Sequence, residues 1–210
     1  MSLLRLASHS AIARHVVARH VVASLMAASL GPANLVAPAA AQNFDEKFSV
    51  CLACHGADGR SETADIPNLA AQRSQYVVIQ LYMFRQGLRK AVPMNDVAKD
   101  LGDAELQRFA DAIAKLPAVP AATNADPARM QRGAALVNQH RCNFCHNRDF
   151  TGNESVPRLA GQREDYLLKS LREYKAGTRT EYQPVMAEVV PPLKDADLAE
   201  LAYYIAHFKP

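Results

Sequence analysis

The hydrophobic residues of the chain recur at three- and four-residue spacing, the period of a helix that buries one face. The clearest stripes predict helices over 103–116 and 195–208, with core positions Leu106, Phe109, Ile113, Leu198, Leu201 and Ile205. Two more helices are predicted over 74–86 and 164–176. Each is followed by a glycine, Gly87 or Gly177, which suits a helix C-terminus. No alternation long enough for a strand is present, so the pattern predicts an all-α protein.

Two further helices are predicted to lead into the paired cysteines of the chain, over residues 44–54 and 127–145. The second has a strong start signal, because Asp126 can cap the first backbone amides and Pro127 suits the first helical position. These helices bring the expectation to three in each half of the chain.

The two halves of the chain are copies of one repeated sequence unit. The segment from Pro67 to Tyr76 matches the segment from Pro157 to Tyr166 at an offset of 90 residues (157 − 67). Matched pairs continue beyond it and include Leu81 with Leu171, Phe84 with Tyr174, Arg89 with Arg179, and Met94 with Met186. The repeat predicts two domains, residues 42–117 and 127–210. The proline-rich stretch between them, residues 118–126, is predicted to be a linker.

All four cysteines lie in two C-x-x-C-H motifs, at residues 51–55 and 142–146. This motif attaches c-type haem. Two thiols three positions apart can each add to one vinyl group, and the adjacent histidine can then bind the iron as an axial ligand. The motifs predict two covalently bound haem c groups, attached through Cys51, Cys54, Cys142 and Cys145 and ligated by His55 and His146.

Paired cysteines have two other uses, a disulfide within each pair and a zinc site built from both pairs. Zinc sites of this kind usually place the pairs about 15–20 residues apart, whereas 88 residues separate Cys54 from Cys142 (142 − 54). A redox disulfide does not need a histidine directly after each pair. Haem attachment accounts for the wide separation of the two pairs and for the histidine that follows each of them.

A haem that only carries electrons needs a second strong axial ligand, and a methionine thioether suits because it raises the potential. Met94 and Met186 correspond in the repeat, and they follow His55 and His146 by 39 and 40 residues. Both are predicted in proline-containing loops. The alternative is that both fill gaps in the core, as methionine often does; the matched positions favour ligation.

Two other pairs of residues match in the repeat, Tyr76 with Tyr166 and Arg89 with Arg179. Core packing explains the tyrosines, and solvated charge at a helix end explains the arginines. A contact with a haem propionate is the alternative for each pair.

Residues 1–41 have the composition of a secretory signal peptide. They contain three arginines and no acidic residue, then an apolar run, and they end in three alanines. Cleavage after Ala41 and a periplasmic location are predicted. An uncleaved membrane anchor is the alternative, but Gly31 and Pro32 interrupt the apolar stretch.

Cleavage there would leave 21 basic residues (24 − 3) against 21 acidic ones. The formal net charge of the mature chain is then zero. No basic patch or charge run is present, so nucleic acid is not expected as a partner.

The motifs together resemble the dihaem cytochrome c4 family over residues 44–208. They are C-x-x-C-H-G-x-D-G, P-x-L-A-x-Q, a tyrosine, G-x-R, a methionine and L-x-D-x-[DE]-L. The resemblance implies two class I cytochrome c domains related by a pseudo-twofold axis, each wrapped around a covalent haem with His/Met ligation. It also implies that Pro67 and Pro157 offer backbone carbonyls to Nδ1 of the two axial histidines. The chain departs from the family where Asn147 replaces the glycine found at position 56 and where Ala71 replaces a glycine.

The resemblance further implies an electron carrier rather than an enzyme, working between a respiratory complex or dehydrogenase and a terminal oxidase or reductase. Its partners would be redox proteins, and peripheral membrane association stays open. An alternative is the haem subunit of a dehydrogenase complex such as flavocytochrome c sulfide dehydrogenase, which the motifs do not separate. A third is a haem enzyme, such as a peroxidase or thiosulfate-oxidising cytochrome, against which the matched methionines argue.

Overall fold

The computed structural model describes residues 39–179 and 184–210, with side chains from residue 43 onward. The predicted signal peptide lies outside these residues, apart from the backbone of its last three. The described residues form helices and one isolated bridge, between Asn153 and Val156, and no strand. None of the described helices combines the length and apolar character needed to cross a membrane. The all-α prediction is therefore confirmed for this part of the chain.

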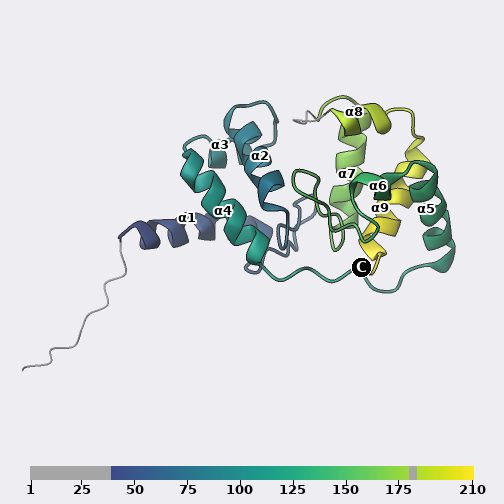
Figure 1. The fold of residues 1–210 in the computed structure, drawn as a ribbon, viewed down its shortest axis with the longest axis horizontal. Coiled ribbons are helices and arrows are strands. Elements are labelled where there is room, and N and C mark those ends of the chain that lie inside the picture. The colour runs from purple at the N-terminus through teal and green to yellow at the C-terminus, as the bar shows by residue number, and fades with distance from the viewer. Residues whose placement is uncertain (1–38, 180–183) are drawn as a thin grey trace, which may run out of the picture. The chain divides into compact units, whose positions relative to one another are not determined.

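The helices follow the predicted order along the chain (Figure 1). They are α1 (Ala39–His55), α2 (Ser74–Arg85), α3 (Met94–Ala98), α4 (Asp103–Lys115), α5 (Pro127–Gln139), α6 (Cys142–Cys145), α7 (Glu164–Lys175), α8 (Val185–Val189) and α9 (Asp195–His207). The long helices α2, α4, α7 and α9 match their predictions to within one residue at each end, because their apolar stripes and end signals are local features of the sequence.

Three parts of the helix prediction were wrong. The first helix begins at Ala39 and not at residue 44. The expected helix over 127–145 is two helices, because Arg141 adopts a left-handed conformation with φ of 56° and separates α5 from α6. The expected loops around Met94 and Met186 contain the one-turn helices α3 and α8, which follow Pro93 and Pro184 directly. Five residues are too few for a hydrophobic period to reveal.

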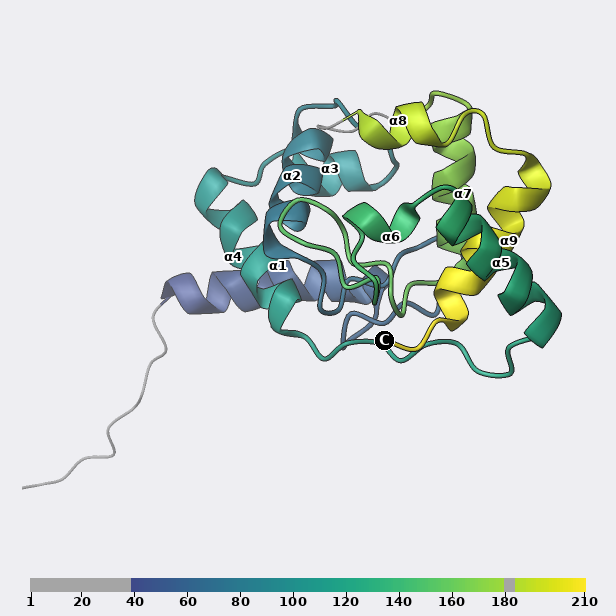
Figure 2. The same ribbon diagram turned by 45° about the vertical axis from the view of Figure 1, so that its right-hand side comes forward.

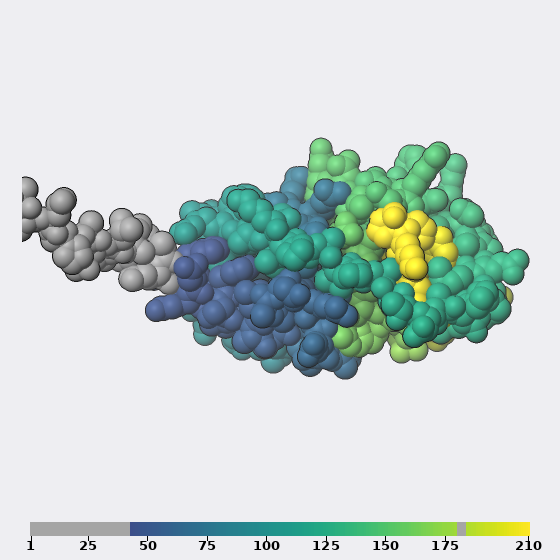
Figure 3. Space-filling model, turned by 90° about the horizontal axis from the view of Figure 1, so that it is seen from below, coloured from purple at the N-terminus to yellow at the C-terminus, as the bar shows by residue number. Residues whose placement is uncertain are grey.

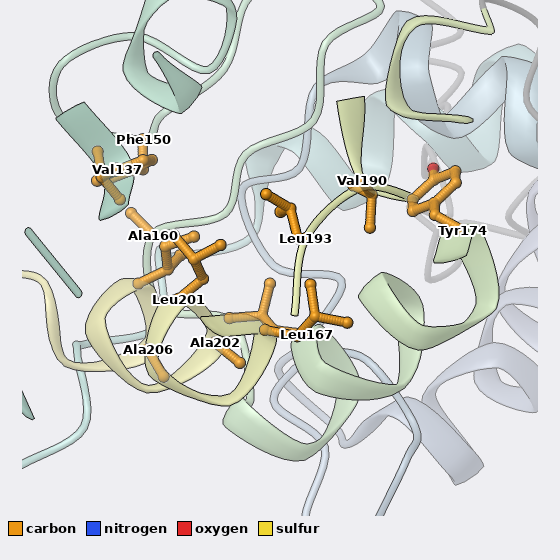
Figure 4. Packing of buried hydrophobic residues seen from close by; sticks show 12 residues of the cluster. Val137, Phe150, Ala160, Leu167, Tyr174, Val190, Leu193, Leu201, Ala202 and Ala206 are labelled. Carbon is orange, nitrogen blue, oxygen red and sulfur yellow. The ribbon is translucent and has the colours of Figure 1, made fainter. Parts of the chain in front are cut away.

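Each half of the chain has its own hydrophobic core. In the first half α2 packs on α4, and the rings of Phe44 and Phe48 of α1 stack on the buried Phe109, with centroids 5.1 and 6.1 Å away. In the second half α9 lies against both α5 and α7 (Figures 1 and 2). Figure 4 shows this second core, whose members include Val137, Leu167, Tyr174, Val190, Leu193 and Leu201.

The predicted linker is tied to the second half by backbone contacts. The Ala122 N–H donates to the Ala206 carbonyl at 2.9 Å, and the Asp126 N–H donates to the Tyr203 hydroxyl at 2.6 Å. Figure 3 shows the C-terminal residues, in yellow, surrounded by teal and green atoms of the second half and the chain that leads into it. These bonds fix the path of the linker along the end of α9.

The two departures from the family pattern keep left-handed turns. Asn147 has φ of 66°, as Gly56 has 86°, and asparagine tolerates this conformation. Its side-chain amide also donates to the Gly152 carbonyl at 2.9 Å. Ala71 has φ of 54° where its counterpart Gly161 has 73°. The chain therefore holds the same turn with different residues in its two halves.

Replacing Gly161 with alanine is expected to destabilise the protein by about 1–3 kcal/mol more than replacing Gly177, because of overpacking. A Cβ on Gly161 would lie 2.0 Å from the Val119 carbonyl oxygen, whereas a Cβ on Gly177 meets nothing within 4 Å. Both glycines have a left-handed φ, so the backbone strain is shared and cancels in the comparison. Urea unfolding of the two variants measures the difference, and equal midpoints would contradict it.

Candidate haem sites

The two cysteine pairs lie at the ends of helices. Cys51 and Cys54 occupy the last turn of α1, which ends at His55, and the second pair forms the two ends of α6. In both pairs the first cysteine is half-buried and the second is exposed, and none of the four forms a disulfide. Before haem is attached, burial raises the pKa of the Cys51 and Cys142 thiols.

The alternatives for the cysteines receive no support from this geometry. Neither pair forms a disulfide. Among the described residues, no three His, Cys, Asp or Glu side chains gather closely enough to hold a metal ion, so a zinc site lacks its ligands.

Both motif histidines are buried and held by a backbone carbonyl. Nδ1 of His55 lies 2.8 Å from the Pro67 oxygen, and Nδ1 of His146 lies 3.1 Å from the Pro157 oxygen. A carbonyl can only accept, so Nδ1 carries the proton and Nε2 keeps its lone pair for a metal. Burial lowers the pKa of both histidines, and the hydrogen bond to the carbonyl opposes this. A neutral imidazole is the form that binds iron.

The two methionines occupy equivalent places in the two halves. Met94 is the first residue of α3 and packs against the first core, and Met186 lies in α8 and packs against the second. Each half thus offers two thiols, one carbonyl-anchored imidazole and one thioether, and this donor set fits a covalently attached haem.

The prediction of solvated charge for the matched arginines was wrong, because Arg89 and Arg179 are only 9% and 6% exposed. Each bonds a tyrosine of the other half: Arg89 donates to the Tyr166 hydroxyl and Arg179 to the Tyr76 hydroxyl, both at 3.1 Å. Burial raises the pKa of Tyr166, but the charges of Arg179 and Arg89 outweigh it and lower this pKa to about 7. Arg179 also pairs with Glu173 at 3.9 Å, and contact of these residues with a haem propionate stays a prediction.

A shallow hollow of about 460 Å³ lies at the second motif. It is lined by Asn138, Arg141, Asn143, Phe144, Asn147 and Arg148. None of the predicted iron ligands lines it, so it is a surface feature and not the expected place of the haem.

The glutamine of P-x-L-A-x-Q occurs in both copies of the repeat, and both copies make contacts between the two halves. Gln72 and Gln162 are 8% exposed, and each side chain bonds the backbone of the opposite half. The recurrence of a glutamine at the same place in both copies was the one signal that the sequence offered.

The fold and the paired donor sets define the class of protein, a c-type cytochrome, and the cytochrome c family model matches residues 130–209. Cytochrome c4 of Pseudomonas aeruginosa is 31% identical over 186 residues, which cover 83% of this chain and 90% of that protein. The chain belongs to the cytochrome c4 family. It is therefore a c-type cytochrome that carries electrons and binds two haem c groups covalently.

Two further similarities extend this result. The crystal structure of reduced recombinant cytochrome c4 from Pseudomonas stutzeri matches with a TM-score of 0.73 and 29% identity, covering 80% of this chain and 98% of that one. It supports the fold prediction of tandem cytochrome c domains. The thiosulfate dehydrogenase electron acceptor of Thiomonas intermedia is 30% identical, covering 81% of this chain and 83% of that protein.

Proposed function

We propose that each half, residues 42–117 and 127–210, is a domain with one six-coordinate haem iron. The first site uses the thiols of Cys51 and Cys54 for attachment and His55 with Met94 as axial ligands. The second uses Cys142 and Cys145 for attachment and His146 with Met186 as axial ligands. The observation that carries the proposal is the same donor set at matched positions in both halves, with each imidazole anchored on a proline carbonyl.

The bound haem supplies a one-electron couple between ferric and ferrous iron. The residues of the chain then have three tasks. The Pro67 and Pro157 carbonyls keep the Nδ1 proton in place, so that Nε2 of each histidine would be free to bind the iron. Met94 and Met186 offer the soft thioether sulfur that favours the ferrous state. With a histidine and a methionine at each iron, no position would be left open, so small molecules would be kept out and the protein would only carry electrons.

We also propose that the protein works in the periplasm, between a respiratory complex or dehydrogenase and a terminal oxidase or reductase. Redox partners need access to the haem edge, and several exposed apolar side chains lie beside the proposed ligands. Val92 is 92% exposed and precedes Pro93 and Met94, and Phe144 is 82% exposed between the second pair of cysteines. We propose that these two side chains take part in the contact with a redox partner.

A second candidate is a lasting subunit of a dehydrogenase, and the similarity to thiosulfate dehydrogenase electron acceptors favours it. In both cases the chain accepts electrons and the donor chain performs the oxidation. The two candidates differ in whether the complex persists after the electron has moved.

Native gels distinguish the free carrier from the lasting subunit. Periplasmic and membrane extracts are run beside the purified protein and stained for haem. A band that co-migrates with the purified protein is expected for a free carrier. A larger haem-positive species with no free pool would show a subunit. In parallel, the purified ferric protein is mixed with extract and either thiosulfate or a respiratory substrate. Failure of every extract to reduce it would contradict the carrier proposal.

A further inference from the structure

Two glutamines make the same pair of hydrogen bonds from opposite halves of the chain. Oε1 of Gln162 accepts from the Asn68 N–H at 2.8 Å, and its Nε2 donates to the Asn68 carbonyl at 2.9 Å. Gln72 bonds the N–H and the carbonyl of Arg158 in the same way, at 2.7 and 3.0 Å. Because both the glutamines and their targets are matched positions of the repeat, the four bonds form a reciprocal clamp.

The clamp acts on the peptide unit that holds each motif histidine. The Asn68 N–H and the Pro67 carbonyl belong to one planar peptide unit. Its oxygen faces Nδ1 of His55, and its N–H donates to Gln162 of the other half. Because the unit is rigid, fixing its N–H also fixes the direction of its carbonyl.

The other half repeats this arrangement with the roles exchanged. The Arg158 N–H and the Pro157 carbonyl share a peptide unit, whose oxygen faces His146 and whose N–H donates to Gln72. Each histidine is therefore two hydrogen bonds away from a glutamine of the opposite half.

Both glutamines are themselves held in place. Oε1 of Gln72 also accepts from the Arg73 N–H at 3.0 Å, and Oε1 of Gln162 accepts from the Arg163 N–H at 2.9 Å. These arginines are the residues that precede α2 and α7. Since both glutamines are buried, water cannot readily replace their bonds, and their loss would leave buried backbone groups unpaired.

We propose that each glutamine is a positioning residue for the axial histidine of the opposite half: Gln162 for His55, and Gln72 for His146. Hydrogen bonds in a chain polarise one another, so a peptide unit that donates to the glutamine offers its carbonyl as a better acceptor to the histidine. A stronger bond at Nδ1 makes the imidazole a more basic ligand, which stabilises ferric iron and lowers the potential. The inference rests on the proposed axial role of the histidines and not on the identity of any redox partner.

The test uses Gln72→Met and Gln162→Met in the holoprotein, because methionine has a similar size and cannot make the clamp bonds. Gln75→Met and Gln131→Met serve as matched controls at exposed positions. Spectroelectrochemical titration gives the two midpoint potentials. Paramagnetic NMR assigns each to its haem, since the Met94→Ala and Met186→Ala variants each label one set of signals.

Gln72→Met is expected to raise the potential of the second-half haem, and Gln162→Met that of the first-half haem. The ferrous-to-ferric ratio should change about three- to tenfold at fixed solution potential, where tenfold is about 59 mV for one electron. The midpoint potential of the haem in the mutated half should change less than that of the haem in the other half. Amide exchange of Arg158 should speed up in Gln72→Met, while that of Asn68 should not.

A shift confined to the mutated half, equal shifts in both halves, or no shift would overturn the proposal. Equal shifts would mean that the glutamines only hold the halves together. If a methionine variant does not fold, Gln72→Glu keeps an acceptor for the Arg158 N–H and loses the donor. A carboxylate is the stronger acceptor, so the potential of the second-half haem is then expected to fall, and that of the first-half haem to change less. Failure of histidine ligation would appear separately, as a missing low-spin His/Met spectrum in the unsubstituted protein.

Discussion

Replacing Met186 with alanine is expected to turn one of the two haems high-spin and to lower its potential. Alanine cannot bind iron, and the loss of the thioether removes the ligand that favours the ferrous state. Axial ligands set haem potentials over a range of about 0.8 V, so a fall on the order of 0.1–0.3 V is expected for that haem. The haem of the first half should keep its spectrum. Optical and EPR spectra with a redox titration make the measurement.

Met130 provides the control for this experiment. It is half-buried on α5 and has no methionine counterpart in the first half, so Met130→Ala should leave both haems low-spin. An unchanged spectrum and titration in Met186→Ala would remove Met186 from the iron. The equivalent change at Met94 should affect the other haem alone, because α3 and α8 pack against separate cores.

Phe150→Ala is expected to lower the free energy of unfolding strongly. The Phe150 ring is 1% exposed and makes edge contacts with Tyr204 and Phe208, at centroid distances of 6.2 and 5.0 Å. Removing a buried phenylalanine ring costs about 3–5 kcal/mol through lost burial and the cavity left behind. Urea unfolding followed by circular dichroism should show this loss.

The backbone of Phe150 also supports the loop that follows Pro157, and the substitution leaves these backbone bonds in place. Its carbonyl accepts from the N–H groups of Leu159 and Ala160, at 2.8 and 3.0 Å, just beyond Pro157. Phe150 has φ of 55°, which strains alanine as much as phenylalanine, so the variant isolates the contribution of the ring.

Phe144→Ala is the matched control for stability. This ring is 82% exposed, so its removal should change the free energy of unfolding by less than about 0.5 kcal/mol, as surface substitutions usually do. Similar losses in the two variants would show that Phe150 does not support the second core.

Local features of the sequence were enough to predict the haem chemistry and most of the helices. C-x-x-C-H is a contiguous motif, and the spacing of two thiols and an imidazole is set by covalent geometry. The long helices have end signals and apolar stripes within a single segment, as α4 and α9 show. The duplication pointed to the matched methionines, because a ligand needed by both haems is expected at the same place in both copies.

Tertiary structure alone decided the features that depend on contacts between the halves. Arg89 follows a helix and reads as a solvated charge, yet it is buried against Tyr166, which is 77 residues away. Gln72 bonds Arg158 across 86 residues, and no periodicity or motif links two such positions. Burial and long-range hydrogen bonds arise only when distant segments meet. The sequence by itself therefore determined the cofactor and the repeat, and the folded chain decided that each half holds the histidine anchor of the other.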